Sequence, residues 1–224
     1  MERLFKQLGF KPRDIKIYEQ AFIHTSYAYE NNLDYSYETL EFLGDAIVDL
    51  VVSDYLYRNC DFDEGKMTKI RASYVCENAL YEYASGLDFG KYIRLGHGER
   101  QSGGSHKKAI LADVFEAFIA ALYLDLGYDK AKDVALKIIV PYIENKDIML
   151  FSDYKSELQE VVQDVQKSLK YVLVSESGPA HDKCFKMSVI IDDIVYGEGE
   201  GHTKKEAEQE AAKAALKKLV KEDR

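Results

Sequence analysis

The stretch YETLEFLGD, residues 37–45, begins a pattern that is acidic on one side and apolar on the other. At about 100° per residue, Glu38, Glu41 and Asp45 fall within about 60° of one another on a helix. The apolar residues that follow fall on the opposite side, as expected for a helix with one face on a core. This apolar stripe consists of Leu40, Leu43, Ile47, Leu50 and Val51. The stretch therefore predicts an amphipathic helix with carboxylates on its open face.

A second helical stretch, KAILADVFEA at residues 108–117, carries two acids in apolar surroundings. From residue 109 to residue 124 the only charged side chains are Asp113 and Glu116. Their i, i+3 spacing places both on the same side of a helix. Charged groups are rarely buried unless an opposite charge or a metal ion compensates them. The stretch thus predicts either a bound cation or a buried ion pair with lysine or arginine.

Taken together, Glu41, Asp45, Asp113 and Glu116 form a set of oxygen ligands that suits Mg²⁺ or Mn²⁺. The five histidines show neither the H-E-x-x-H pattern of zinc hydrolases nor the E-x-x-H pattern of di-iron bundles. Two hard cations about 3.5–4 Å apart can activate water and stabilise a phosphodiester under attack. The acids predict magnesium-dependent phosphoryl transfer, and the alternative for the first cluster is a merely solvated acidic face.

Two further residues of the first stretch are informative. Gly44 inside a helix costs about 1 kcal/mol relative to alanine, which indicates a close backbone approach to another helix or to a ligand. Phe42 lies beside the acids and away from the apolar stripe. It either contacts a partner protein or packs on another helix of the same chain, and the pattern leaves both open.

The composition bounds the class of protein. A length of 224 residues with 46% hydrophobic residues suggests two domains, and a formal charge of −9 restricts any nucleic-acid contact to local basic patches. Three cysteines without a C-x-x-C pair indicate reduced thiols. The chain starts without the apolar segment of a signal peptide, and no apolar run is long enough to span a membrane. We expect a cytoplasmic protein with no membrane contact.

Periodicity separates the chain into an all-α part at 1–147, a linker at 148–152 and a small α+β domain at 153–224. Helical periodicity covers 15–23, 40–57, 67–85, 109–126 and 129–143. The second part has the order α-β-β-β-α, which predicts a three-stranded antiparallel sheet with two helices on one face. Its elements are expected at 155–169, 171–177, 184–191, 194–199 and 204–221. Asp192-Asp193 is typical of a hairpin turn, and Thr203 with Glu206 forms a capping box.

The glycine-rich segment at 94–108 contains Arg94, Arg100, Lys107 and Lys108 and either approaches a phosphate backbone or is a solvated loop. It lacks the G-x-x-x-x-G-K-[ST] pattern, so we expect no nucleotide cofactor.

The small domain carries a possible duplex-binding surface. Thr203, Lys204 and Lys205 stand at a helix N-terminus, where free N–H groups and two cations attract phosphate. A polar strip on its first helix and a turn at 178–181 suit the 2′-hydroxyls and shallow groove of A-form RNA. The strip consists of Ser156, Gln159, Glu160 and Gln163, and the turn presents Pro179 and His181. The alternative is an ordinary solvated surface.

These motifs together resemble bacterial ribonuclease III over essentially the whole chain. YETLEFLGDA resembles the family signature E-R-L-E-F-L-G-D-[SA], AILADVFEA its second acidic helix, and HTSY at 24–27 its early H-x-S-Y. The segments LQE at 158–160, GPAH at 178–181 and GEGHTKKEAEQ at 199–209 resemble a double-stranded-RNA-binding domain.

The resemblance implies a homodimer that cleaves double-stranded RNA, such as ribosomal RNA precursors, and leaves 5′-phosphates and two-nucleotide 3′ overhangs. It implies Mg²⁺, with Mn²⁺ as a substitute, held by the four acids named above. Asp45 and Glu116 are then also catalytic, Glu38 and Glu64 are outer carboxylates that border the catalytic valley, and Phe42 is a knob that enters a socket on the partner subunit.

Two positions depart from the family pattern. Thr39 replaces the usual arginine and Tyr37 the frequent preceding asparagine, which puts local support or substrate preference in doubt. A rival interpretation is a non-catalytic RNA-binding or ribosome-assembly protein on this fold, but such a protein would be expected to lack at least one of the four acids. A magnesium-dependent phosphohydrolase for small nucleotides would not explain the RNA-binding half.

Overall fold

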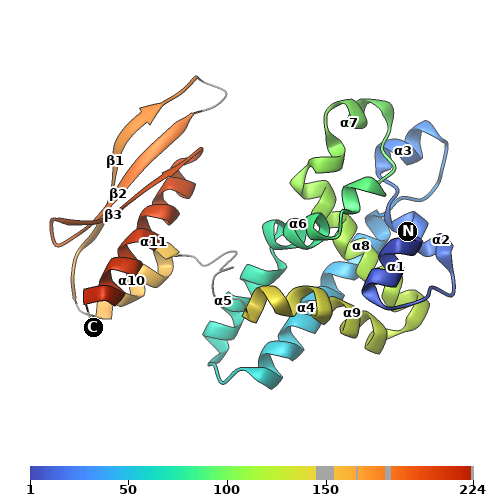
Figure 1. Cartoon of the computed structure of the whole chain (residues 1–224), viewed down its shortest axis with the longest axis horizontal. Helices are drawn as coiled ribbons and strands as arrows, with labels where there is room; N and C mark the ends of the chain where they lie inside the picture. Colours follow the sequence, from blue (N-terminus) through green and yellow to red (C-terminus); the bar gives the residue numbers. More distant parts are fainter. Residues whose placement is uncertain (145–153, 165, 180–182, 223–224) are drawn as a thin grey trace. The chain divides into compact units, whose positions relative to one another are not determined.

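The computed structural model describes residues 1–144, 154–164, 166–179 and 183–222, and it divides into two compact units, Met1–Phe151 and Ser152–Arg224 (Figure 1). The first unit is helical and the second is a small α+β unit, which confirms the expected fold class. The expected linker at 148–152 and the domain boundaries beside it lie outside the described residues, so they stay predictions. Each unit is described by itself below.

The helical unit contains α1 (Glu2–Leu8), α2 (Ile15–Ala21), α3 (Thr25–Glu30), α4 (Glu38–Asn59), α5 (Glu64–Val75), α6 (Glu77–Gly86), η1 (Phe89–Lys91), α7 (His97–Gln101), η2 (Gly104–His106), α8 (Lys108–Leu126) and α9 (Tyr128–Glu144). The single helix expected at 67–85 is two helices, because Cys76 has an extended backbone between α5 and α6. The short helices α1 and α3 were not predicted, because seven and six residues are too few for a periodic pattern.

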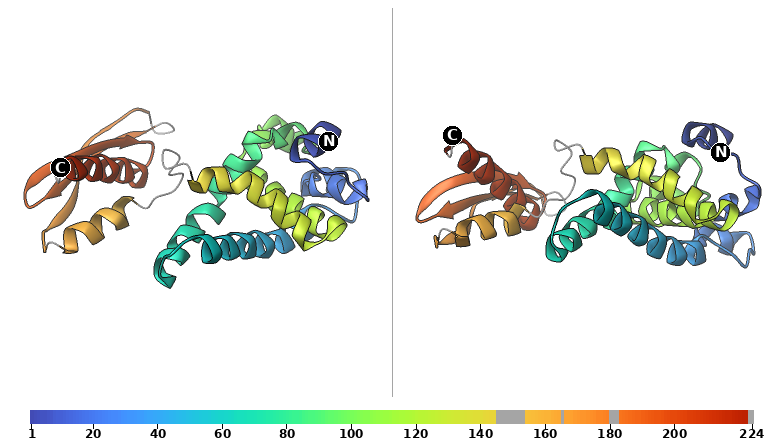
Figure 2. Two further views of the ribbon diagram at one scale, coloured as in Figure 1. Left: turned by 60° about the horizontal axis from the view of Figure 1, so that its bottom comes forward. Right: turned by 90° about the horizontal axis from the view of Figure 1, so that it is seen from below.

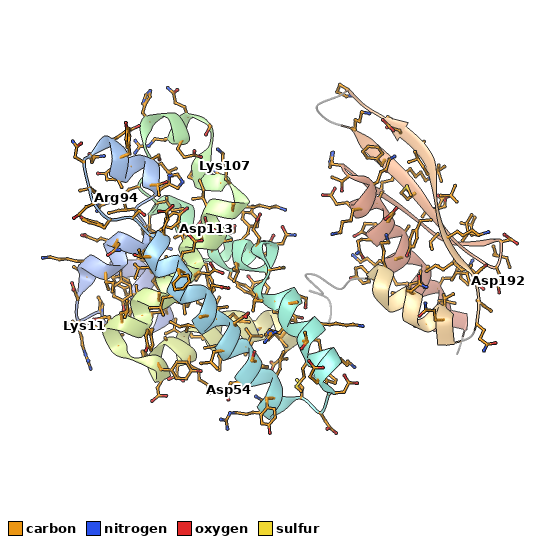
Figure 3. The ribbon with its side chains drawn as sticks, turned by 180° about the vertical axis from the view of Figure 1, so that it is seen from behind. Lys11, Asp54, Arg94, Lys107, Asp113 and Asp192 are labelled. Atoms are coloured by element: carbon orange, nitrogen blue, oxygen red, sulfur yellow. The ribbon has the colours of Figure 1, made fainter. Side chains whose placement is uncertain are left out.

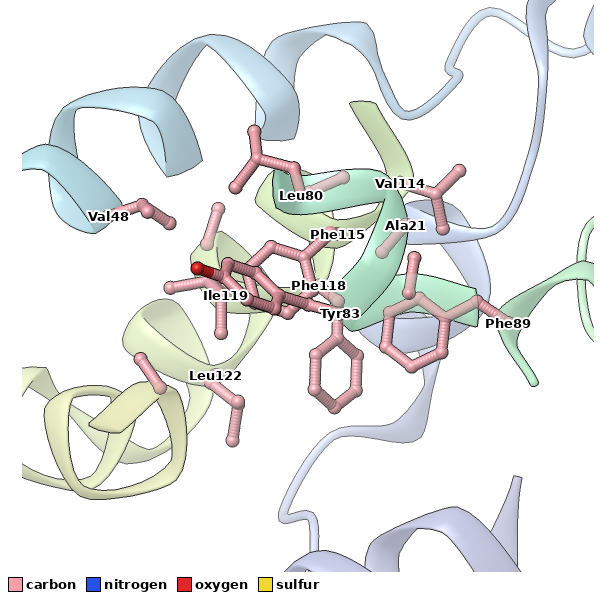
Figure 4. Packing of buried hydrophobic residues seen from close by; sticks show 14 of the residues in the cluster. Ala21, Val48, Leu80, Tyr83, Phe89, Val114, Phe115, Phe118, Ile119 and Leu122 are labelled. Carbon is pink, nitrogen blue, oxygen red and sulfur yellow. The ribbon is translucent and has the colours of Figure 1, made fainter. Parts of the chain in front are cut away.

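Helix α8 forms the centre of this unit and packs most extensively on α4 and α6. Its side chains from Val114 to Phe118 are buried except Glu116, and Figure 4 shows Phe115 and Phe118 among Tyr83, Phe89 and Leu80. Rings meet edge to face there, with the centroids of Phe89 and Phe118 5.1 Å apart. This core holds the acidic residues of α8 in fixed positions.

The apolar stripe of α4 is buried as predicted at Leu40, Ile47 and Val51, but the prediction for Leu50 was wrong. Leu50 is 54% exposed. It stands at the edge of the stripe, toward the side of Phe42, and the core covers only the middle of the stripe.

The small unit consists of α10 (Tyr154–Asp164), β1 (Leu169–Ser177), β2 (Cys184–Ile191), β3 (Ile194–Gly201) and α11 (Lys204–Glu222). The strands are antiparallel in the order β1-β2-β3, and both helices cover the same face of the sheet (Figures 1 and 2). Helix α10 ends before the predicted residue 169, because Leu169 already pairs with Ile191 in the sheet.

Local signals in the small unit are confirmed. Asp192 and Asp193 have φ values of 46° and 64°, as a tight hairpin turn requires. At the start of α11, the Glu206 amide donates to Thr203 Oγ1 and the Thr203 amide donates to Glu206 Oε2, each at 3.1 Å. This capping box places the N-terminus of α11 where the sequence predicts it.

None of the helices in the described part of the chain is long and apolar enough to cross a membrane. The three cysteines are free thiols.

Candidate functional site

Helices α4 and α8 pack closely against each other at Gly44. An ideal Cβ atom on Gly44 would lie 2.0 Å from the main-chain carbonyl oxygen of Glu116. Only a residue without a side chain fits there, which confirms that the glycine serves a close helix approach. The approach sets Asp45, the next residue of α4, beside Glu116 of α8. Figure 3 labels Asp113 of α8 and Asp54, which lies farther along α4.

Two of the four acids have strongly raised pKa values. Burial raises the pKa of Glu116 to about 8, and the negative charges of Asp45, Glu41, Asp113 and Asp49 add to the effect. Burial likewise raises the pKa of Glu41 to about 7, with further contributions from Asp113, Glu38 and Asp45. The charges of Asp45 and Asp113 thus raise the pKa of both Glu41 and Glu116, and the four acids form one electrostatically coupled cluster.

Asp113 is half-buried, and burial raises the pKa of its carboxyl group. Tyr37 opposes this rise, because its hydroxyl donates a hydrogen bond of 3.0 Å to Asp113 Oδ2. Tyr37 immediately precedes α4, so the bond joins the start of α4 to α8.

The alternative of a buried ion pair is wrong for this cluster. Among the residues that the structure describes, no lysine or arginine forms an ion pair with Glu41, Asp45, Asp113 or Glu116. Within the same residues, no group of three or more His, Cys, Asp or Glu side chains is arranged to hold a metal ion. The four acids are thus neighbours that are not yet in a coordination geometry.

The donor set nevertheless fits a hard divalent cation. All four groups are carboxylates, which Mg²⁺ and Mn²⁺ prefer, and their mutual repulsion is the kind of electrostatic cost that a cation removes. The acids project from α4 and α8, the two helices whose apolar sides pack in the core of the helical unit.

The two outer carboxylates lie in different places. Glu38 is in the first turn of α4, where its charge raises the pKa of Glu41, so it borders the four acids. Glu64 begins α5 and accepts a hydrogen bond of 3.1 Å from Thr68 Oγ1. It lines a hollow of about 220 Å³ with Tyr57 and Arg71, away from the acids within one chain. A role for Glu64 at the border of the catalytic valley stays a prediction.

Phe42 is 83% exposed, so the alternative that it packs inside its own chain is wrong. It stands on α4 one residue after Glu41, on the open side of the helix. A large exposed aromatic ring next to the acids is suited to a protein contact.

The glycine-rich segment is folded, because it contains α7 and η2. It is fastened to α3 by hydrogen bonds from the Gly96 amide to Ser26 Oγ at 2.9 Å and from the His97 amide to Glu30. Its Lys107 forms an ion pair of 2.7 Å with Glu99. The segment is thus ordered by α7, η2 and these contacts but largely exposed to solvent, and the phosphate contact stays a prediction.

In the small unit, the predicted RNA-binding residues that the structure describes lie on the surface. Lys204 and Lys205 are exposed in the first turn of α11, directly after the Thr203 cap. Gln159 and Gln163 are exposed on α10, and Pro179 is exposed after β1. The side chains of Ser156 and Glu160 and all of His181 lie outside the described residues.

Two residues of the site were missed by the sequence interpretation. Asp49 contributes to the raised pKa of Glu116, and its i+4 spacing from Asp45 was the available signal. Tyr37 was noted only as a departure from a family pattern, and no local signal indicates that its hydroxyl contacts a residue 76 positions later.

Comparison with known proteins adds two family matches. Residues 14–143 match the model of the family described as ribonuclease-III-like, and residues 154–219 match that of the double-stranded RNA binding motif. The protein named Ribonuclease 3 of Listeria monocytogenes is 46% identical over 223 residues, which cover 98% of this chain and 97% of that protein. Ribonuclease 3 of Oceanobacillus iheyensis is 46% identical over 217 residues, or 95% of each chain.

Solved structures resemble the helical unit. Two crystal structures of the nuclease domain of ribonuclease III from Campylobacter jejuni give TM-scores of 0.60 and 0.59. The first is 34% identical in sequence, and the match covers 65% of this chain and 97% of that structure's chain. The second is 36% identical, and the match covers 62% of this chain and 96% of that structure's chain. One is described as showing flexibility in a region involved in dimer formation.

Proposed function

This chain belongs to the ribonuclease III family of double-stranded-RNA endonucleases, and from that premise we propose that it cuts RNA duplexes by two-metal-ion catalysis at the α4–α8 acids. The observation that carries the proposal is the coupled cluster of Glu41, Asp45, Asp113 and Glu116, which has no ion-pair partner among the described residues.

The proposed role of each acid follows from its position. Glu41, Asp45, Asp113 and Glu116 hold Mg²⁺, or Mn²⁺ in its place, and bound ions supply an activated water and charge stabilisation at the phosphate. Glu116 has the most strongly raised pKa of the four acids, and the charge of Asp45 across the helix contact contributes to this rise. We therefore assign the catalytic role to these two acids. Glu38 extends the acidic edge at the start of α4 and helps to orient the catalytic groups, and Glu64 borders the valley from a second chain.

The small unit holds the substrate. Lys204 and Lys205 contact phosphates together with the free amides of α11, and Thr203 secures that helix end. Gln159 and Gln163 on α10 reach 2′-hydroxyls and base edges in the shallow groove, with Ser156 and Glu160 from the same helix. Pro179 and His181 contact the next shallow groove, as the resemblance of the segment GPAH to a double-stranded-RNA-binding domain implies. The amides, lysines and glutamines recognise duplex shape and carry little sequence preference.

The enzyme acts as a homodimer, with one set of acids for each strand. Phe42 beside the acids is the dimer contact, and its exposure supports this role. The products carry 5′-phosphates and two-nucleotide 3′ overhangs. Ribosomal RNA precursors and other structured RNAs in the cytoplasm are the substrates.

Digestion of a 30-base-pair RNA, analysed on a gel, tests the proposal. Cleavage is expected with Mg²⁺ or Mn²⁺ and is expected to stop with EDTA, while gel-shift binding persists in EDTA. A duplex that is bound and never cut under any of these conditions would identify a passive RNA-binding protein. Cleavage that continues in EDTA would exclude the metal mechanism.

A further inference from the structure

Tyr37 is a buried residue that contacts the candidate metal site and has no assigned part in it. Only 4% of its surface is exposed, and its hydroxyl donates to Asp113 Oδ2 at 3.0 Å. The phenol is neutral, so it can stabilise one carboxylate oxygen without competing for the cation as a lysine would.

The main chain of Tyr37 is held as firmly as its side chain. Its amide donates to the carbonyl oxygen of Ile23 at 2.9 Å, and its own carbonyl oxygen accepts from the amides of Leu40 and Glu41, each at 2.9 Å. The ring stands edge-on against His24, with centroids 5.7 Å apart. Tyr37 therefore joins the backbone of Glu41 on α4 to the carboxylate of Asp113 on α8.

Groups that hydrogen-bond to a metal ligand fix its rotamer and thereby affect the affinity for the metal. Asp113 lies among like charges, which would turn its carboxylate away unless a donor held it. Tyr37 is positioned to hold Oδ2 of this carboxylate and so to fix its rotamer.

We propose that Tyr37 is a positioning residue that orients the Asp113 carboxylate toward the cation and thereby sets the affinity of the site for divalent metal. The inference rests on the proposed function, because it takes Asp113 as a ligand. It assigns a role to one of the two positions at which the sequence departs from the family pattern.

The test is Tyr37→Phe, which removes one oxygen atom and keeps the ring in the core. Binding of Mn²⁺ to the full-length, metal-free protein is measured by electron paramagnetic resonance without RNA, and the Mg²⁺ concentration for half-maximal duplex cleavage is measured separately. The Mn²⁺ dissociation constant and the half-maximal Mg²⁺ concentration are each expected to rise about 10- to 100-fold. The cleavage rate at saturating Mg²⁺ is expected to stay within about threefold of the wild-type rate, because the carboxylate itself remains.

Tyr18→Phe is the matched control. Tyr18 is fully buried in the same unit, and its hydroxyl donates to Asp125 Oδ2 at 2.9 Å, but Asp125 belongs to no proposed metal site. The control is expected to lose thermal stability and to keep wild-type Mn²⁺ binding. Thermal midpoints of both variants in EDTA separate a loss of folding from a loss of metal affinity.

The inference would be overturned if Tyr37→Phe bound Mn²⁺ as tightly as the wild-type protein, or if Tyr18→Phe lost as much Mn²⁺ affinity as Tyr37→Phe. In either case, cleavage of RNA by the wild-type protein would leave the proposed function standing. A wild-type protein that neither binds Mn²⁺ nor cuts RNA would overturn both.

Discussion

The Cβ position of Gly44 lies 2.0 Å from the main-chain carbonyl oxygen of Glu116, closer than any side chain allows. This contact decides how the two acidic helices meet. Glu41 and Asp45 stand on either side of the glycine on α4, and Asp113 stands one turn before Glu116 on α8. The contact thus connects the packing of the helical unit to the chemistry of its acids.

Gly44→Ala should force α4 and α8 apart and destabilise the protein by about 1–3 kcal/mol. The added methyl group meets backbone atoms, which cannot move aside as the end of a flexible side chain would. Urea unfolding measures the stability, and duplex cleavage should fall because the acids separate. Gly98→Ala is the control, since nothing lies within 4 Å of that Cβ position and Gly98 lies in helix α7, so this change should not lower the stability.

Glu116→Gln should abolish cleavage of duplex RNA in Mg²⁺ and leave binding nearly unchanged. The substitution removes a ligand charge but almost no volume, so the fold and the small unit are preserved. Gel-shift and cleavage assays on the same 30-base-pair RNA measure the two effects. Glu2→Gln, an exposed change on α1, should keep full activity, and substantial activity in Glu116→Gln would remove this residue from the site.

Without metal, the protein should lose stability as the pH rises from about 5 to about 8. The folded-state pKa values of Glu41, about 7, and Glu116, about 8, lie above their ordinary value of 4.5. The folded chain therefore binds more protons than the unfolded chain in this window, and deprotonation favours unfolding. Thermal midpoints at several pH values in EDTA measure the effect.

The Glu116→Gln variant isolates this pH effect, because other groups titrate as well. It should gain stability relative to the wild-type protein as the pH rises, and the gain should shrink when Mg²⁺ is added. An equal pH dependence in both proteins would contradict the assignment of the raised pKa to Glu116.

Phe42→Ala should weaken the homodimer, as sedimentation equilibrium would detect. The ring is 83% exposed in one chain, so its removal should change the thermal midpoint of the monomer little. Tyr29→Ala provides the comparison, since Tyr29 is 87% exposed and lies on a different helix, α3. A dimer constant unaffected by Phe42→Ala, or equally affected by both changes, would argue against Phe42 as the contact.

Lys204→Ala combined with Lys205→Ala should weaken duplex binding and lower the slope of log K against log salt by about 2. For each lysine–phosphate contact that is lost, binding releases about one counterion fewer from the RNA. The measurement is made in the Glu116→Gln background, where RNA stays intact. Lys217→Ala with Lys218→Ala, near the other end of α11, should leave the slope unchanged, and an unchanged slope for the first pair would exclude it from the phosphate contacts.

The sequence determined the features that depend on neighbours along the chain. The acidic and apolar faces of α4, the strand order, the Asp192-Asp193 turn and the Thr203 cap all follow from periods of 3.6 or 2 residues and from short turn and cap motifs. The choice of carboxylates as ligands for a hard cation also follows from residue type alone.

Tertiary structure decided what depends on residues far apart in the sequence. The Gly44–Glu116 contact, the Tyr37–Asp113 hydrogen bond and the exposure of Phe42 and Leu50 follow from how α4 rotates and crosses on α8. That rotation is set by the packing of the whole aromatic core, in which every ring constrains the next, and periodicity within a single helix contains no information about it.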